Sequence, residues 1–177
     1  MWSTCNVGAN SETEYGDYYT WGSGSTVYDA TNPYRSLNTA SILSSAEDTA
    51  TQVMGGAWSM PTEQQISELI ENTNYSFTTI NGVNGGKYTS KTDSNKYVFF
   101  PAAGQWDGEL RWVGQASQVH SSSSPKDQNS EAGMLASDST SGRYVTLGRL
   151  NGVSVRGVCH KTENSGTGQD TGILSLS

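Results

Sequence analysis

The clearest pattern of hydrophobic and polar positions predicts a helix over residues 62–72. Thr62 and Gln65 have the spacing of a capping box, in which two side chains satisfy backbone amides at the start of a helix. The apolar residues of this segment recur at helical spacing: Ile66, Leu69 and Ile70. A weaker apolar stripe predicts a second helix over residues 44–55, which a serine at its first or second position would cap and a Gly-Gly pair would end.

Shorter apolar runs predict strands in the second half of the chain. Residues 97–104 form a continuous apolar run that is typical of a buried strand. The alternating runs 143–147 and 153–158 are expected to pair with each other. The intervening residues 105–142 are polar and irregular, which indicates a long loop. Turn signals rich in Gly and Asn stand at residues 22–24, 81–82 and 84–86.

The order of these elements predicts an α+β fold with two helices, short strands and long loops. The chain has 177 residues, which is long enough for one domain with a buried core. Only 33% of the residues are apolar, but five Trp, nine Tyr and three Phe supply large buried areas. We therefore expect one ordered domain over residues 1–160 and a weakly ordered tail over residues 161–177.

Charge and hydropathy exclude two classes of function. The net charge is −7 with only ten Lys and Arg residues, so the clustered cations that nucleic-acid binding needs are lacking. The longest apolar stretches fall well short of the roughly 18 residues that a membrane-spanning helix requires. Neither a nucleic-acid partner nor insertion into a membrane is expected.

Two cysteines, Cys5 and Cys159, lie near the two ends of the expected domain. They are either two unrelated thiols or one disulfide that ties the N-terminal strand to the last core strand. Their strand-like surroundings favour the disulfide, which in the chain-entropy model would stabilise the fold by about 5 kcal/mol. A disulfide would also indicate an oxidising, extracellular setting. Two cysteines alone cannot form a four-ligand zinc site, and the chain has only two histidines, His120 and His160. No metal site is expected.

Catalytic and cofactor motifs are weak. His120 precedes the run Ser121–Ser124, but no Gly-x-Ser-x-Gly elbow surrounds these serines, so a polar loop is the better interpretation. Asp107 and Glu109 lack the partner motif of a calcium-dependent lectin and indicate a solvated acidic loop. No Gly-rich phosphate loop is present. We expect neither catalysis nor a cofactor.

Five separated blocks of the chain resemble a bacterial family, the Fibrobacter succinogenes major paralogous domain, which is abundant in Bacteroidetes and their phages. The blocks occur in the family's order and cover most of residues 2–160: Trp2–Ala9 (WSTCNVGA), Tyr15–Gly22 (YGDYYTWG), Gly55–Thr62 (GGAWSMPT), Phe99–Gly104 (FFPAAG) and Ser154–Cys159 (SVRGVC). The resemblance implies a C-type lectin-like fold with adjacent termini. It also implies a long loop region that presents ligand contacts.

Several domains of this lectin-like group are the variable proteins of diversity-generating retroelements, in which adenine-templated codons near the 3′ end of the gene are rewritten. This chain departs from the family pattern at residues 119–122, 133–136 and 146–150, and has Gly157 where the family has Pro. These departures lie in the C-terminal half, where diversification would act. The resemblance therefore implies a diversified binding face, displayed outside the cell on a phage tail or a bacterial surface.

Candidate contacts lie in this C-terminal half. Trp and Arg are common anchors of interfaces, and Met adapts to irregular partners. The expected ligand-binding residues are Trp106, Glu109, Arg111, Trp112, Gln118, Val119, His120, Ser122, Gly133, Met134, Ala136, Thr146, Leu147, Arg149 and Leu150. A position in the core is the alternative for Trp106 and, separately, for Trp112. We expect Trp2, Trp21 and Trp58 to be core residues.

The best functional hypothesis from the sequence is a non-catalytic domain that binds a protein or glycan on a target cell surface. Two alternatives stay open. One is a fixed structural or adhesive module of a bacterial surface protein. The other is an enzyme or a metal-dependent lectin.

Overall fold

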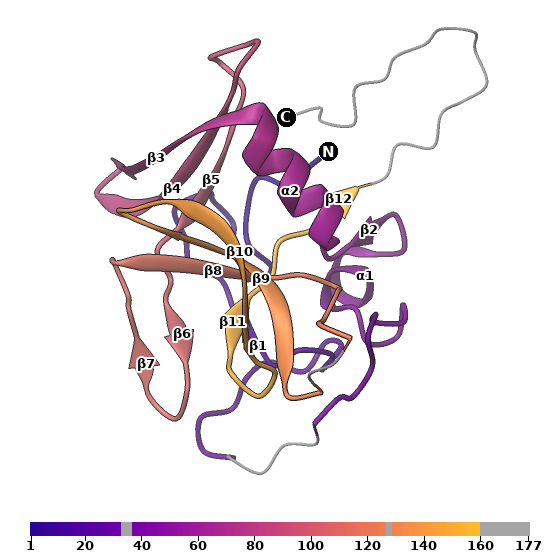
Figure 1. Ribbon diagram of the computed structural model, residues 1–177. Helices are drawn as coiled ribbons and strands as arrows, with labels where there is room; N and C mark the ends of the chain where they lie inside the picture. Colours follow the sequence, from indigo (N-terminus) through magenta and orange to yellow (C-terminus); the bar gives the residue numbers. More distant parts are fainter. Residues whose placement is uncertain (33–36, 127–128, 160–177) are drawn as a thin grey trace, which may run out of the picture.

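The computed structural model describes residues 1–32, 37–126 and 129–159 and has a mixed α+β fold (Figure 1). The expected tail and His160 lie outside the described residues. Within them there are two helices, α1 (Thr49–Met54) and α2 (Glu63–Asn72). The strands are β1 (Tyr18–Tyr19), β2 (Trp58–Ser59), β3 (Thr73–Ile80), β4 (Val83–Ser90), β5 (Tyr97–Pro101), β6 (Gln105–Trp106), β7 (Leu110–Arg111), β8 (Ala116–His120), β9 (Glu131–Asp138), β10 (Gly142–Gly148), β11 (Val153–Ser154) and β12 (Val158–Cys159).

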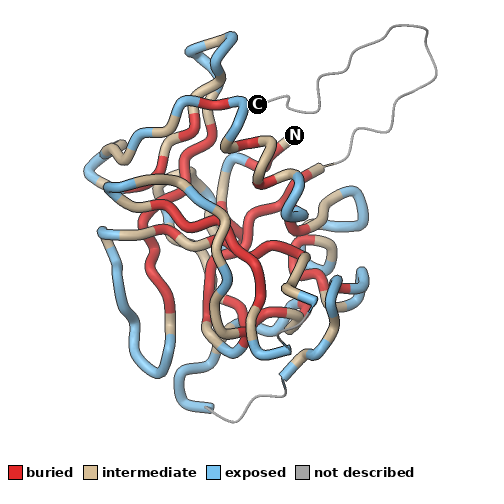
Figure 2. The backbone as a smooth tube through the Cα atoms, in the orientation of Figure 1, coloured by how far each residue is buried: buried red, intermediate tan, exposed pale blue. Residues whose placement is uncertain are grey.

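A five-stranded sheet in the order β1-β11-β8-β9-β10 forms the centre of the fold. The prediction of a long loop over residues 105–142 is therefore wrong, because this stretch contains β6 to β9. The interior residues of β9 are buried on both faces of the strand, so its sequence lacks the alternation that marks a half-buried strand. Figure 2 shows this buried stretch in the interior of the molecule.

The predicted pairing of residues 143–147 with residues 153–158 is also wrong. Residues 143–147 belong to β10, which pairs antiparallel with β9 along its whole length. β11 lies between β1 and β8, antiparallel to the first and parallel to the second. A regular alternation shows that a segment is a strand, but it does not identify the strand's partner.

A second sheet has the order β3-β4-β5. Its first hairpin turns at Asn81-Gly82, where φ is +48° and +80°, as the turn signal predicts. The turn predicted at residues 84–86 is wrong, because these residues lie inside β4. Gly86 is needed for close approach instead: a Cβ at this position would lie 2.6 Å from the Cβ of Ser137 in β9.

The sequence predicted the bounds of α2 more accurately than those of α1. α2 has the predicted capping box: the Gln65 amide donates to Thr62 Oγ1 at 3.1 Å, and Thr62 N donates to Gln65 Oε1 at 3.0 Å. α1 is shorter than residues 44–55, and its cap is Asp48 rather than one of the predicted serines. The buried Asp48 carboxylate accepts from the amides of Thr51 and Met60, both at 2.9 Å, so it joins the start of the helix to the residue that follows β2.

The buried side chains include two clusters. One contains Trp2, Tyr88, Phe100, Val119 and Leu135 and is covered by α2, which packs against β9 and β10. The other contains Trp21, Met60 and Val155. Trp2 and Trp21 are core residues as predicted, whereas Trp58 is only half-buried.

The two ends of the domain lie side by side. The amino group of Met1 donates to the carbonyl of Cys159 at 3.0 Å, and Trp2 forms a bridge with Val158. The predicted disulfide between Cys5 and Cys159 is not formed in this structure, and both residues are half-buried. Backbone hydrogen bonds rather than a covalent link join the ends here.

Candidate functional site

The structure separates the sequence-predicted contact residues into a buried and an exposed set. The buried set occupies interior strands or turns: Val119, His120, Ser122, Gly133, Met134, Ala136 and Arg149. These side chains are less than 10% exposed, so they offer little surface to a large partner, although Ala136 lines the pocket described below. The exposed set is Glu109, Arg111, Trp112, Thr146 and Leu150, with Trp106, Gln118 and Leu147 half-buried.

Arg149 shows why residue type misled the prediction. Its side chain is 1% exposed, and its guanidinium donates to the carbonyls of Glu131 and Ala40 and to Ser124 Oγ, each at 2.8 Å. The guanidinium also lies 4.5 Å from the centre of the Trp21 ring. Arg149 therefore joins the loop around Ala40 to the sheet and is a structural residue.

His120 is buried and neutral. Its Nε2–H donates to the carbonyl of Tyr19 at 2.8 Å, which leaves Nδ1 as the acceptor nitrogen. Nδ1 has no partner among the described residues, so His120 is not bonded to any of the neighbouring serine hydroxyls. Burial lowers the pKa of His120 to about 4. The Ser–His pair of a nucleophilic site is not assembled here.

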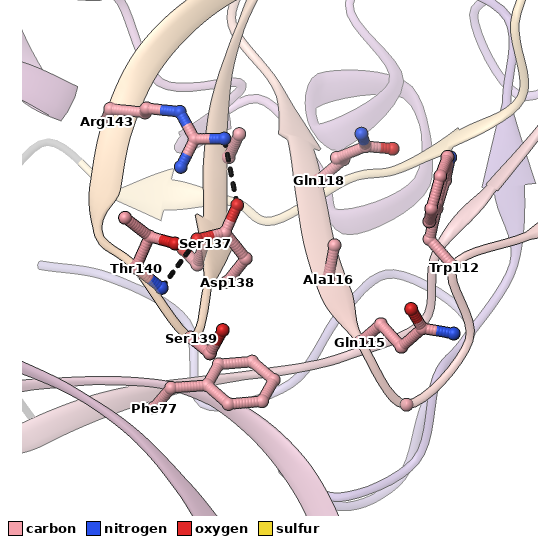
Figure 3. Close-up of a pocket in the computed structure, with 12 residues that line it drawn as sticks. Phe77, Trp112, Gln115, Ala116, Gln118, Ser137, Asp138, Ser139, Thr140 and Arg143 are labelled. Carbon is pink, nitrogen blue, oxygen red and sulfur yellow. Dashed lines mark hydrogen bonds and ion pairs between the residues drawn. The ribbon is translucent and has the colours of Figure 1, made fainter.

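A pocket of about 540 Å³ lies beside β8, β9 and the turn into β10 (Figure 3). It is bounded by the loop before β8, by β8 and β9, by the turn into β10 and by one side chain from β3. The lining residues are Phe77, Trp112, Gly114, Gln115, Ala116, Gln118, Ala136, Ser137, Asp138, Ser139, Thr140 and Arg143. Of the contact residues predicted from the sequence, this pocket brings together Trp112, Gln118 and Ala136.

Trp112 is held in a strained position at this pocket. Its φ is +65°, and the one other non-glycine residue with positive φ in the described ranges is Asn81, whose side chain tolerates this conformation. The Trp112 carbonyl accepts from the amides of Gln115 and Ala116, at 2.9 and 3.0 Å. The Gly114 amide donates to Ala102 at 2.8 Å. The backbone is thus fixed while the side chain remains 52% exposed.

An ion pair forms the other side of the pocket. A terminal guanidinium nitrogen of Arg143 lies 2.8 Å from Asp138 Oδ2. Asp138 Oδ1 accepts from the amides of Thr140 and Ser141, at 2.8 and 3.2 Å. The hydrogen bond from Arg143 is the largest cause that lowers the pKa of Asp138, to about 2. Asp138 is therefore ionised across the physiological range and is poorly suited to proton transfer there.

Gln118 lies between Trp112 and the ion pair (Figure 3), and Ala136 lines the same pocket. They face each other across β8 and β9, and Ala136 also faces Arg143 across β9 and β10. Because the Ala136 side chain is small, open space remains between Gln118 and Arg143, and this space is part of the pocket. Gln118 Oε1 is enclosed and has no hydrogen-bond partner among the described residues. Such an atom costs free energy unless something bonds to it.

The sequence missed Phe77, Asp138 and Arg143. Phe77 belongs to the β3–β4 hairpin, and no local pattern connects that hairpin with Trp112. The segment from Asp138 to Ser141 does carry a local signal, because an Asp that caps the amides two and three residues later is a common turn former. The signal predicts a turn and leaves its position beside Gln118 undetermined.

The acidic loop at the β6–β7 hairpin is partly neutralised by its own arginine. Arg111 Nε lies 2.7 Å from Asp107, and the same guanidinium contacts Glu109. In the described part of the chain, no three His, Cys, Asp or Glu side chains gather closely enough to hold a metal ion. Neither described helix is long and apolar enough to cross a membrane.

Stacking and hydrogen bonding are thus the interactions that this pocket offers to a ligand. Comparison with known proteins adds no relative: the chain matches no protein-family model, and no curated protein or solved structure is significantly similar to it.

Proposed function

We propose that this domain is a non-catalytic binding module that recognises a protein or a glycan on the surface of a target cell. The observation that carries the proposal is the exposed indole of Trp112 on a fixed, strained backbone beside the pocket. Strained residues persist where the surrounding structure holds them, and they cluster at functional sites. Trp and Arg are also enriched among the residues that contribute most to binding interfaces, and both Trp112 and Arg143 line this pocket.

The framework blocks support a C-type lectin-like fold for this module. The family resemblance implies two helices, adjacent ends of the domain and long loops, and the structure has two helices and joins Met1 to Cys159. On this proposal the domain is displayed outside the cell, on a phage tail fibre or a bacterial surface. A rigid scaffold would then carry the contact residues.

Diversification by a retroelement is compatible with the exposed part of the predicted face. Substitutions at Glu109, Arg111, Trp112, Thr146 and Leu150 would change the surface and leave both buried clusters intact. We propose that a diversified locus varies at these positions and stays constant at the buried ones.

A fixed adhesive module is the second candidate, and burial favours it. Two of the three segments in which the chain departs from the family pattern, 119–122 and 133–136, are buried throughout. Variation there would disturb the core, whereas drift in a fixed sequence can be accommodated by compensating changes. Deep sequencing of the codons for residues 100–160 in a clonal population separates the two candidates. Adenine-templated substitutions at exposed positions support diversification, and a uniform sequence supports the fixed module.

Binding itself is tested with fluorescently labelled protein on intact Bacteroidetes cells, measured by flow cytometry. We expect saturable binding that Trp112→Ala reduces by about tenfold or more. Leu110→Ala is the matched control, because Leu110 is 41% exposed on the neighbouring strand and does not line the pocket. Equal binding by wild type and Trp112→Ala would reject the proposed site.

A further inference from the structure

The pocket beside Trp112 combines an aromatic surface with closely spaced polar groups. Trp112 and Phe77 supply the rings, and Gln118, Asp138 and Arg143 supply the hydrogen-bonding groups. Its volume of about 540 Å³ lies within the range of roughly 300–1,000 Å³ typical of small-ligand sites. A ligand that fills it needs one apolar face and several hydroxyl or amide groups around its edge.

The charges in the pocket favour an uncharged ligand. Of the described residues that line it, only Asp138 and Arg143 are charged, and they neutralise each other at 2.8 Å. A carboxylate or phosphate ligand would have to compete with Asp138 for the guanidinium. A cation would have to compete with Arg143 for the carboxylate. A neutral ligand disturbs neither partner of the pair.

The hydrogen-bonding groups favour a ligand that both donates and accepts. The Arg143 guanidinium has five N–H donors, of which the bonds to Asp138 and Ser141 occupy only part. Asp138 can accept further bonds at Oδ2. The Gln118 side chain lines the same pocket, and its enclosed Oε1, which has no partner among the described residues, becomes an acceptor for a ligand when the amide group turns toward the pocket. Adjacent hydroxyl groups satisfy such a mixed set, because each hydroxyl donates once and accepts twice.

Trp112 supplies the remaining feature. The face of an indole carries partial negative charge, and the C–H groups on one face of a sugar ring are partially positive. The backbone that carries the indole is fixed by hydrogen bonds from the Gln115 and Ala116 amides, so only side-chain rotation is left to be lost when a ring stacks on it. Stacking on one side and hydroxyl contacts on the other match the two sides of the pocket in Figure 3.

We infer that this pocket binds an uncharged saccharide, with a sugar ring against Trp112 and hydroxyl groups toward Gln118, Asp138 and Arg143. The inference rests on the proposed function and names the ligand class of the same site. A protein epitope on the cell surface is the competing ligand.

The test is an NMR titration of the ¹⁵N-labelled full chain with neutral saccharides at millimolar concentration. The probes are glucose, galactose, mannose, xylose, N-acetylglucosamine and disaccharides of each. At least one probe is expected to shift the Trp112 indole, Gln118 amide and Arg143 guanidinium signals together. Trp112→Ala should weaken that binding by about tenfold, and Leu110→Ala should not. Added salt should leave the affinity unchanged, because the ligand is neutral.

The same labelled protein on intact cells separates failure of the inference from failure of the proposed function. Loss of cell binding after periodate oxidation of surface glycans, with no loss after protease treatment, supports the saccharide. Cell binding that only protease removes, or a panel in which no probe shifts the pocket signals, overturns it. If only protease removes cell binding, the proposed surface-recognition function stands, with a protein as the ligand. Saccharide binding without any cell binding would reject the surface function and keep the saccharide site.

Discussion

The guanidinium of Arg143 lies 2.8 Å from the carboxylate of Asp138, across the turn that joins β9 to β10. Backbone amides of the same turn bind the other carboxylate oxygen. The turn therefore holds Asp138, Asp138 holds Arg143, and both groups border the pocket. Residues held in this way can contact a ligand with little reorganisation.

Replacing Arg143 by Gln should affect ligand binding more than stability. The pair is partly exposed, so at neutral pH the free energy of unfolding should fall by less than about 1 kcal/mol. The pKa of Asp138 is lowered from 3.8 to about 2. The contribution of the pair is therefore complete above the unfolded pKa and is lost as the pH falls toward 2. Urea unfolding of both proteins at neutral pH and near pH 2 checks this, and a difference that grows on acidification would contradict it.

His120 should make stability depend on pH in the mildly acidic range. Its pKa is lowered from 6.5 to about 4 in the folded state, so only the unfolded state binds a proton between these values. Stability is complete above pH 6.5 and falls as the pH drops toward 4, by about 3 kcal/mol. Denaturant unfolding across this range measures the slope. His120→Gln keeps a donor for Tyr19 and should have a smaller slope; an unchanged slope would assign the effect elsewhere.

The same substitution should destabilise the protein at Arg149 and have almost no effect on stability at Arg111. Arg149→Met removes buried bonds and leaves carbonyls such as that of Ala40 without a donor, so we expect a loss of about 2–4 kcal/mol. The Arg111 side chain is 47% exposed, and Arg111→Met should leave the free energy of unfolding almost unchanged because water screens its ion pairs. Urea denaturation compares the two variants. Similar losses would show that burial does not decide the role of these arginines.

The strain at Trp112 should be measurable with two small replacements. The positive φ of +65° suits glycine and disfavours alanine. Trp112→Gly should therefore be more stable than Trp112→Ala by about 1 kcal/mol, even though glycine gives the unfolded chain more freedom. Thermal unfolding of the two variants decides the sign. An alanine variant that is equally stable would show that the backbone relaxes once the indole is removed.

Gly86 should tolerate no side chain, in contrast to Gly56. A Cβ at Gly86 would lie 2.6 Å from the Cβ of Ser137, and one at Gly56 would meet no atom within 4 Å. We expect Gly86→Ala to cost about 1–3 kcal/mol through overpacking. Gly56→Ala is the control and should stay within about 0.5 kcal/mol of wild type. Equal stabilities in chemical denaturation would mean that the two sheets move apart freely.

The parts of the fold that depend on neighbouring residues followed from the sequence. The capping box of Thr62 and Gln65, the Asn81-Gly82 turn and the buried strand β5 are all set by local hydrogen bonds or by one continuous apolar run. The start of α1 was missed because Asp48 caps the helix and also binds Met60, so its choice over the serines depends on a second segment.

The central sheet and the pocket were decided by tertiary structure. β9 is buried on both faces, so its residues carry no periodic signal, and its register with β8 and β10 exists only in the folded chain. Arg143 and Arg149 stand six positions apart and look alike in the sequence, yet one borders a pocket and the other is buried. Residue type sets what a side chain can bond to. Packing between distant strands decides whether its partner is a ligand or the protein itself.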